Sequence, residues 1–167
     1  MPFVDWPIRS YEAVGPIRFG MSVRNARAAL AEPLRAVGKG WAHTHSFLKD
    51  SRRDGVPTDD FFDVGLHIYY RVHGQRLVVD ALEAFPPAKL TLDGFPLFEK
   101  PLGVVREFLR RLDPTLADDD DGAKSSKFGI ALYDPSCGEE PDRPPASVFV
   151  WSEGYWQRPP APLVDDA

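Results

Sequence analysis

Histidines and carboxylates are the residues of this sequence with the most obvious capacity for chemistry. His43 and His45 are one residue apart, and in an extended segment this spacing points both rings to the same side. Paired imidazoles of this kind hold zinc, which takes three or four converging protein ligands. A third ligand would have to be His67, His73 or a carboxylate such as Asp59, and the sequence alone does not place any of them beside the pair. The alternative interpretation is an exposed polar loop that binds no metal.

The aspartate run 118–121, followed by Gly122, invites comparison with a calcium-binding loop. Counting from Asp118, the sixth position is Ala123 and the twelfth is Gly129, where an EF-hand requires glycine and glutamate. The register therefore predicts a solvated loop and no calcium site.

Nucleophile and cofactor motifs are missing from the sequence. The single cysteine, Cys137, lies in a predicted turn beside Glu139 and Glu140, whose charges disfavour a reactive thiolate. There is no Gly-x-Ser-x-Gly elbow, phosphate-binding loop, dinucleotide fingerprint or His-Glu-x-x-His helix. We therefore expect no cofactor and favour a non-enzymatic protein, although catalytic groups that converge from distant positions stay open.

Aromatic residues near the end of the chain form the strongest remaining signal. Trp151, Tyr155 and Trp156 lie close to Arg158, and Trp, Tyr and Arg most often carry the binding energy of protein interfaces. The alternative is that Trp151 belongs to the core and the other rings cover a sheet edge. A second predicted contact surface contains Trp41, Arg52 and Arg53, in a segment that we interpret as an insertion loop.

Two helices are expected to position these residues. The first begins after Ser22, whose hydroxyl can cap it, and buries Val23, Ala26 and Leu30 on one stripe before Pro33 ends it. The second spans Pro101 to Leu112, with proline in the first turn and an apolar stripe of Val105, Phe108, Leu109 and Leu112.

Four strands follow from alternating apolar positions and from turn residues. They are predicted at 62–70, 77–85, 128–133 and 147–151, with a hairpin turn at His73-Gly74. In the first of them, His67 is expected on the face opposite Phe62, Val64 and Leu66.

The order of these elements repeats along the chain. Moving each position by 79 places Gly15 on Gly94, Ala26 on Val105 and Arg27 on Arg106, while the strand at Gly65–Tyr69 corresponds to Gly129–Tyr133 at an offset of 64. Such repeats share one core. We predict a single α+β domain over 1–157, with repeat one at 13–85, an insertion at 38–60, repeat two at 89–157 and a tail at 158–167. Its fold is a mostly antiparallel, twisted sheet made of two strand-helix-strand-strand repeats, with the helices on one face.

The segment Ile17-Arg18-Phe19-Gly20-Met21-Ser22 resembles the motif that opens a helix in β-lactamase-inhibitor-protein-like tandem-repeat folds. The chain also resembles small bacterial immunity-type proteins. It departs from the secreted inhibitors because it lacks their disulfide cysteines, and its second repeat has Phe98-Glu99-Lys100-Pro101 where the motif would recur. The resemblance implies a protein that binds and blocks another protein, such as a toxin or an enzyme.

Composition limits the classes of partner. The 167 residues are 43% hydrophobic and 27% charged, with a net charge of −5, which opposes non-specific nucleic-acid binding. No apolar run is long enough to span a membrane, and residues 1–6 show no signal-peptide pattern, so we expect a cytoplasmic protein. The sequence predicts a non-enzymatic module of inhibitor or immunity type. The alternative is a small-molecule or metal-binding domain, or an enzyme, that uses His43, His45 and His67.

Overall fold

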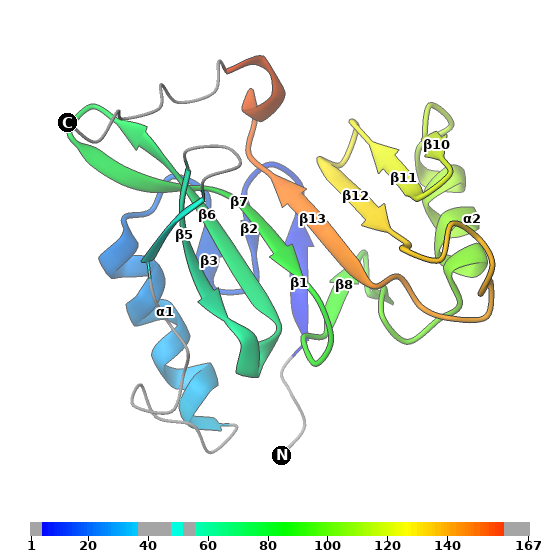
Figure 1. The fold of residues 1–167 in the computed structure, drawn as a ribbon, viewed down its shortest axis with the longest axis horizontal. Coiled ribbons are helices and arrows are strands. Elements are labelled where there is room, and N and C mark those ends of the chain that lie inside the picture. Colours follow the sequence, from blue (N-terminus) through cyan, green and yellow to red (C-terminus); the bar gives the residue numbers. More distant parts are fainter. Residues whose placement is uncertain (1–4, 37–47, 52–55, 159–167) are drawn as a thin grey trace.

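The computed structural model, which describes residues 5–36, 48–51 and 56–158, is built around one eight-stranded antiparallel sheet (Figure 1). The strands lie in the order β10-β11-β12-β13-β7-β6-β5-β4. This confirms the predicted α+β class, and each half of the chain contributes four consecutive strands. The strands of the first half are β4 (Leu48–Ser51), β5 (Val56–Phe61), β6 (Leu66–His73) and β7 (Arg76–Ala84). Those of the second half are β10 (Ala117–Asp119), β11 (Gly122–Ser125), β12 (Ile130–Tyr133) and β13 (Ser147–Trp151).

The two halves meet through their last strands, β7 and β13, in a symmetric register. Leu66 and Ile130 are equivalent positions at the offset of 64. Leu66 pairs with Ala84 in the first half and Ile130 pairs with Val150 in the second, so Ala84 and Val150 are equivalent as well. Across the junction, Ala84 pairs with Val148 and Leu82 with Val150, which centres the pairing on Glu83 opposite Phe149. Equivalent strands that pair antiparallel in this way are related by a pseudo-twofold axis perpendicular to the sheet. Such an axis keeps corresponding helices on the same face.

The helices α1 (Val23–Ala36) and α2 (Leu102–Leu112) lie at opposite ends of the sheet (Figure 1). The Ser22 hydroxyl accepts a hydrogen bond from the Asn25 N–H at 3.1 Å, which confirms the predicted cap. The prediction that Pro33 ends the first helix was wrong, because α1 continues to Ala36. An interior proline costs about 3 kcal/mol. Here the last turn buries Leu34, on the stripe of Ala26 and Leu30, and this burial offsets much of that cost.

A small second sheet lies between the helices. It contains β1 (Trp6–Arg9), β2 (Ala13–Val14), β3 (Ile17–Arg18), β8 (Leu90–Leu92) and β9 (Phe95–Pro96). The hairpins β2-β3 and β8-β9 occupy corresponding places before α1 and α2. Strand β1 joins them, antiparallel to β2 and parallel to β8, which is the exception in an otherwise antiparallel fold.

The two helices and the small sheet cover one face of the large sheet, which we call the core face. Fully buried strand residues on this face include Leu66, Ile68, Leu82, Val148 and Val150. They form one hydrophobic cluster with apolar residues of both helices and of the small sheet. None of the described helices is long and apolar enough to cross a membrane.

Two details of the predicted strands differ from the structure. The strand expected over 62–70 is broken, since Phe62–Val64 form a short 3-10 turn and β6 begins at Leu66. The insertion expected over 38–60 contributes β4 and most of β5 to the sheet. The second half has two further strands at the corresponding places, β10 and β11, so each half has more strands than the predicted unit. Apolar alternation fails to reveal β5 because its buried positions include Thr58, Asp59 and Asp60.

Candidate functional site

The face of the large sheet opposite the core face, which we call the outer face, carries the candidate site. The strand register places Asp60, His67, Glu83 and Phe149 in one row across β5, β6, β7 and β13. The pseudo-twofold axis crosses this row between Glu83 and Phe149. It combines titratable side chains from the first half with an aromatic ring from the second, so the two halves of the outer face differ chemically.

Five aromatic residues, Tyr69, Phe149, Trp151, Tyr155 and Trp156, form a contiguous cluster that we call the aromatic patch. Phe149 is at its centre, with ring centroids 5.7 Å from Tyr69, 6.0 Å from Trp151 and 5.5 Å from Tyr155. Trp156 contacts Trp151 at 5.6 Å and Tyr155 at 5.0 Å, both edge-on. Edge-to-face contacts of this kind favour a fixed arrangement of rings. The structure therefore brings together the predicted Trp151, Tyr155 and Trp156.

The members of the patch differ sharply in exposure. Trp151 is 2% exposed and supports the other rings from below, whereas Trp156 is 54% exposed. The ammonium of Lys124 lies 4.0 Å from the centroid of the Trp156 ring, close enough for a cation–π contact. Tyr133, 46% exposed, stands on the same face diagonal to Phe149 on the neighbouring strand. Among the described residues, the aromatic side chains most open to a partner are Trp156, Tyr133 and Phe62, which is 44% exposed and packs against His67.

Arg158, predicted as a contact residue, also holds the patch in place, and its side chain remains 32% exposed. It follows the 3-10 turn η3 (Tyr155–Gln157) and donates to the buried Asp80 carboxylate of β7, to the Ser152 hydroxyl at 2.8 Å and to the Glu153 carbonyl at 2.9 Å. Arg71 Nε lies 3.2 Å from the same Asp80 oxygen, an ion pair without hydrogen-bond alignment. The Arg158 guanidinium therefore ties η3 to β7 through Asp80, and Arg71 of β6 adds a second positive charge to the same carboxylate. Arg158 therefore belongs to the ordered domain and not to the predicted tail.

Polar side chains in the centre of the outer face are bound to one another. His67 Nδ1 lies 2.7 Å from Asp60 Oδ1, and its ring lies between those of Phe62 and Phe85. Glu83 accepts hydrogen bonds from the Tyr69 hydroxyl at 3.0 Å and the Ser147 hydroxyl at 2.8 Å. Burial, followed by the charge of Glu83, raises the pKa of Tyr69 above its ordinary value, so this phenol stays neutral and acts as a donor.

The structure describes one of the three histidines of the predicted metal site, His67. His67 lies on the face opposite Leu66 as predicted and is paired with Asp60, but its ring contacts Phe62, which was predicted on the other face. His43 and His45 lie outside the described residues. Over residues 5–36, 48–51 and 56–158, no group of three or more histidine, cysteine, aspartate or glutamate residues could hold a metal ion.

The second predicted contact surface cannot be placed, because Trp41, Arg52 and Arg53 also lie outside the described residues. Asp59, considered above as a metal ligand, is fully buried on the core face. It accepts both Arg27 Nε at 2.8 Å and the Tyr70 hydroxyl at 2.9 Å. It is therefore a structural carboxylate that joins α1 to the sheet.

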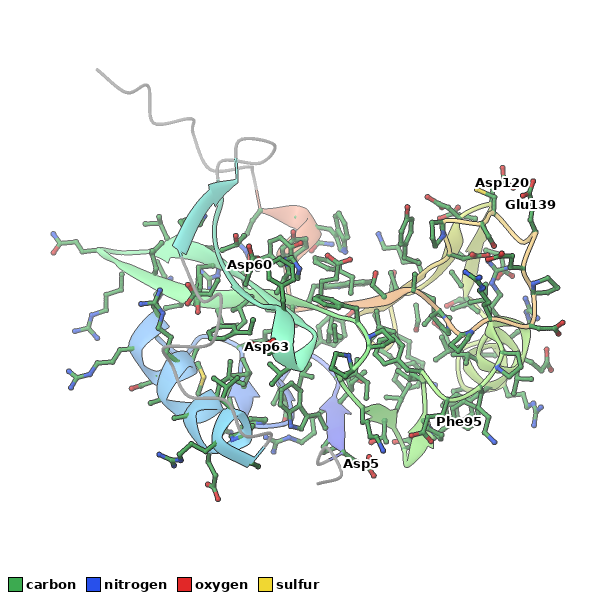
Figure 2. The ribbon with its side chains drawn as sticks, turned by 60° about the horizontal axis from the view of Figure 1, so that its bottom comes forward. Asp5, Asp60, Asp63, Phe95, Asp120 and Glu139 are labelled. Atoms are coloured by element: carbon green, nitrogen blue, oxygen red, sulfur yellow. The ribbon has the colours of Figure 1, made fainter. Side chains whose placement is uncertain are left out.

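An acidic surface lies beside Tyr133. The aspartate run predicted as a loop begins in strand β10 and continues into the tight turn before β11. Gly122, the first residue of β11, pairs with Tyr133, so this turn lies beside Tyr133. The loop after β12 meets the same turn, since the Asp134 N–H donates to the Asp121 carbonyl. Figure 2 shows Asp120 and Glu139 together at this end of the molecule.

Sequence reasoning missed three aromatic residues of the outer face: Tyr69, Tyr133 and Phe149. Each lies at an odd position of an alternating strand whose even positions form the core, for example Phe149 between Val148 and Val150. An aromatic residue at an outward position of such a strand is a signal that the sequence contains and that strand periodicity could have revealed.

Comparisons with protein-family models, with curated proteins and with solved structures gave no match to this chain.

Proposed function

We propose that this chain is a non-enzymatic protein-binding module of inhibitor or immunity type, which blocks a bacterial partner protein through the aromatic patch and Tyr133. The observation that carries the proposal is the exposure of Trp156, which packs on the buried Trp151, together with exposed Tyr133 on the same face of the sheet. Exposed tryptophan and tyrosine backed by buried rings are typical of the few residues that dominate binding energy at protein interfaces.

Preorganisation supports this function. Trp156 contacts Trp151 and Tyr155 edge-on, and Arg158 fixes η3 to Asp80 in the middle of the sheet. A surface that is already ordered loses little conformational entropy when a partner binds. An ordered aromatic surface on the rigid face of a sheet suits a blocking protein, which must bind in one orientation.

The test is co-purification with the products of neighbouring genes. Wild-type protein is compared with a Trp156→Ala/Tyr133→Ala double variant and with a matched control, Val72→Ala/Val104→Ala, which removes apolar side chains that are 61% and 47% exposed elsewhere. We expect a stoichiometric complex with the wild type and the control. Truncating an interface hot spot costs at least about 2 kcal/mol, so each aromatic change should weaken binding by about 30-fold.

The blocking role needs its own readout. The activity or toxicity of the captured partner is measured with and without added protein, and it should fall with the wild type and persist with the double variant. If no neighbouring product forms a stoichiometric complex, or if the double variant binds as well as the wild type, the proposal fails.

A further inference from the structure

The outer face beside Tyr133 has a chemistry that selects one kind of partner segment. We propose that the partner presents an arginine-bearing segment that lies over Tyr133, with its guanidinium groups between the Tyr133 ring and the acidic surface next to it. This inference rests on the proposed function and specifies its partner.

Four exposed carboxylates of this region have no ion-pair partner among the described residues. Asp119, Asp120, Asp121 and Glu139, which we call the acidic rim, are all exposed. Neighbouring carboxylates are neutralised within the chain, since Asp118 pairs with Arg110 at 2.6 Å and Glu140 with Arg143 at 3.0 Å. Within the described part of the chain, the four carboxylates of the rim form no ion pair. The rim therefore offers negative charge to a partner.

Backbone and side-chain contacts hold the rim next to Tyr133. The Asp134 carboxylate accepts from the Ser136 N–H and hydroxyl at 2.9 and 2.6 Å and from the Gly138 N–H at 2.9 Å. The bonds from Ser136 contribute most to lowering the pKa of Asp134 below its ordinary value, so the carboxylate stays ionised and keeps the loop closed. The backbone N–H of the same residue joins this loop to the turn at Asp121. The two parts of the rim are thus fixed relative to each other.

The aromatic side of this region already accepts a cation. Lys124 lies over Trp156, and the ring of Tyr133 is available on the neighbouring strand. A guanidinium is planar and stacks on an aromatic face while its N–H groups pair with a carboxylate, which an ammonium does less well. An acidic segment would be repelled by the four carboxylates of the rim. Arginine therefore fits both the ring and the rim.

The test uses a synthetic peptide of five Arg-Gly repeats, with Lys-Gly and Glu-Gly peptides of the same length as comparisons. Binding is measured by calorimetry and by amide chemical shifts at low and at high salt. We expect the arginine peptide to bind most tightly, to shift the amides of Tyr133 and Gly122, and to weaken with salt. An Asp120→Asn/Asp121→Asn variant and a Tyr133→Ala variant should each lose affinity by about three- to fivefold, as expected for exposed charge and cation–π contacts.

The controls separate this inference from general electrostatics and from the proposed function. Glu12→Gln/Glu32→Gln removes the same charge from exposed sites in the first half, and Tyr133→Phe keeps the ring; both should bind like the wild type. Three outcomes would overturn the inference. The Glu12→Gln/Glu32→Gln control could lose as much affinity as the Asp120→Asn/Asp121→Asn variant, the glutamate peptide could bind as tightly as the arginine peptide, or the arginine peptide could fail to bind at low salt. If the captured partner depends on Trp156 and Tyr133 but is insensitive to the Asp120/Asp121 change, the proposed function stands and this inference falls.

Discussion

The buried ion pair between Arg27 of α1 and Asp59 of β5 gives the sharpest test of how this fold is held together. The Asp59 carboxylate is fully buried and is contacted by Arg27 Nε at 2.8 Å, by the second guanidinium nitrogen at 2.7 Å and by the Tyr70 hydroxyl at 2.9 Å. Replacing Arg27 with methionine leaves a buried carboxylate with the Tyr70 hydroxyl as its remaining donor among the described contacts.

The expected cost follows from this geometry. Breaking a buried pair by removing one partner costs about 3–5 kcal/mol, because the other charge is left uncompensated. The Arg27 side chain is 37% exposed, so water can replace part of what the guanidinium supplies. We therefore expect Arg27→Met to lower the free energy of unfolding by about 2–3 kcal/mol. Adding Asp59→Ala should then recover part of the loss, since the double variant has no buried charge.

The pseudo-twofold symmetry provides an internal control. Arg106 of α2 corresponds to Arg27, and the register places Ala123 where the first half has Asp59. Arg106 donates to the Gly122 carbonyl at 3.1 Å. Arg106→Met should cost about 1 kcal/mol, the usual worth of a hydrogen bond with some packing.

Urea unfolding followed by far-ultraviolet circular dichroism measures the wild type and the three variants under one condition. A buried uncompensated charge is not the cause of the loss if the Arg27→Met/Asp59→Ala protein is less stable than Arg27→Met alone, or if Arg106→Met is as damaging as Arg27→Met. Either outcome would mean that the helix position itself, and not the buried charge, determines the effect.

Three further predictions concern the backbone, alkaline pH and the patch. Gly65 has φ of +70°, and a Cβ there would lie 1.9 Å from the Phe85 carbonyl oxygen, so Gly65→Ala should cost at least about 2 kcal/mol in the same urea assay. Burial, followed by the nearby Asp59 charge, raises the pKa of Tyr70, so the unfolded chain loses this proton first. The stability that Tyr70 contributes is present below its ordinary pKa near 10 and falls by about 1.4 kcal/mol per pH unit above it, a slope that Tyr70→Phe should remove. Arg158→Met should weaken partner binding while the circular dichroism spectrum is retained, because Trp156 loses its anchor to the sheet; unchanged affinity would show that Arg158 has no positioning role.

The metal alternative has a direct measurement. If His43 and His45 bind zinc, elemental analysis of the purified protein should find about one equivalent, and a His43→Ala/His45→Ala variant should lose it and melt at a lower temperature. Protein without metal, and a variant that melts like the wild type, would remove this function. The described residues contribute His67 to that hypothesis and pair it with Asp60.

The symmetric halves have different surfaces on the same scaffold. The first half puts the pair of Asp60 and His67 on the outer face, whereas four of the five rings of the aromatic patch come from the second half. Residue types at core positions are constrained because they pack in the hydrophobic cluster that both halves share, whereas residue types at outer positions are free of that constraint. This is the physical reason why a repeated fold can keep its core pattern and still present one specialised surface.

Local sequence patterns determined the elements whose signals are short in range. The Ser22 cap, the stripe of α2, the hairpin at His73-Gly74 and the α+β class all follow from spacing, because caps, helical stripes and tight turns depend on residues close together in the chain.

Tertiary structure alone decided the features that depend on distant residues. Nothing local shows that Pro33 can stay inside a helix, that Asp59 is buried against Arg27, or that β7 pairs with β13. These features arise because burial and pairing energies are gained only when both partners are in place, and they can outweigh local preference. The candidate site is of the same kind. Its rings come from β6, β12, β13 and η3, and the sheet register is what brings them onto one face.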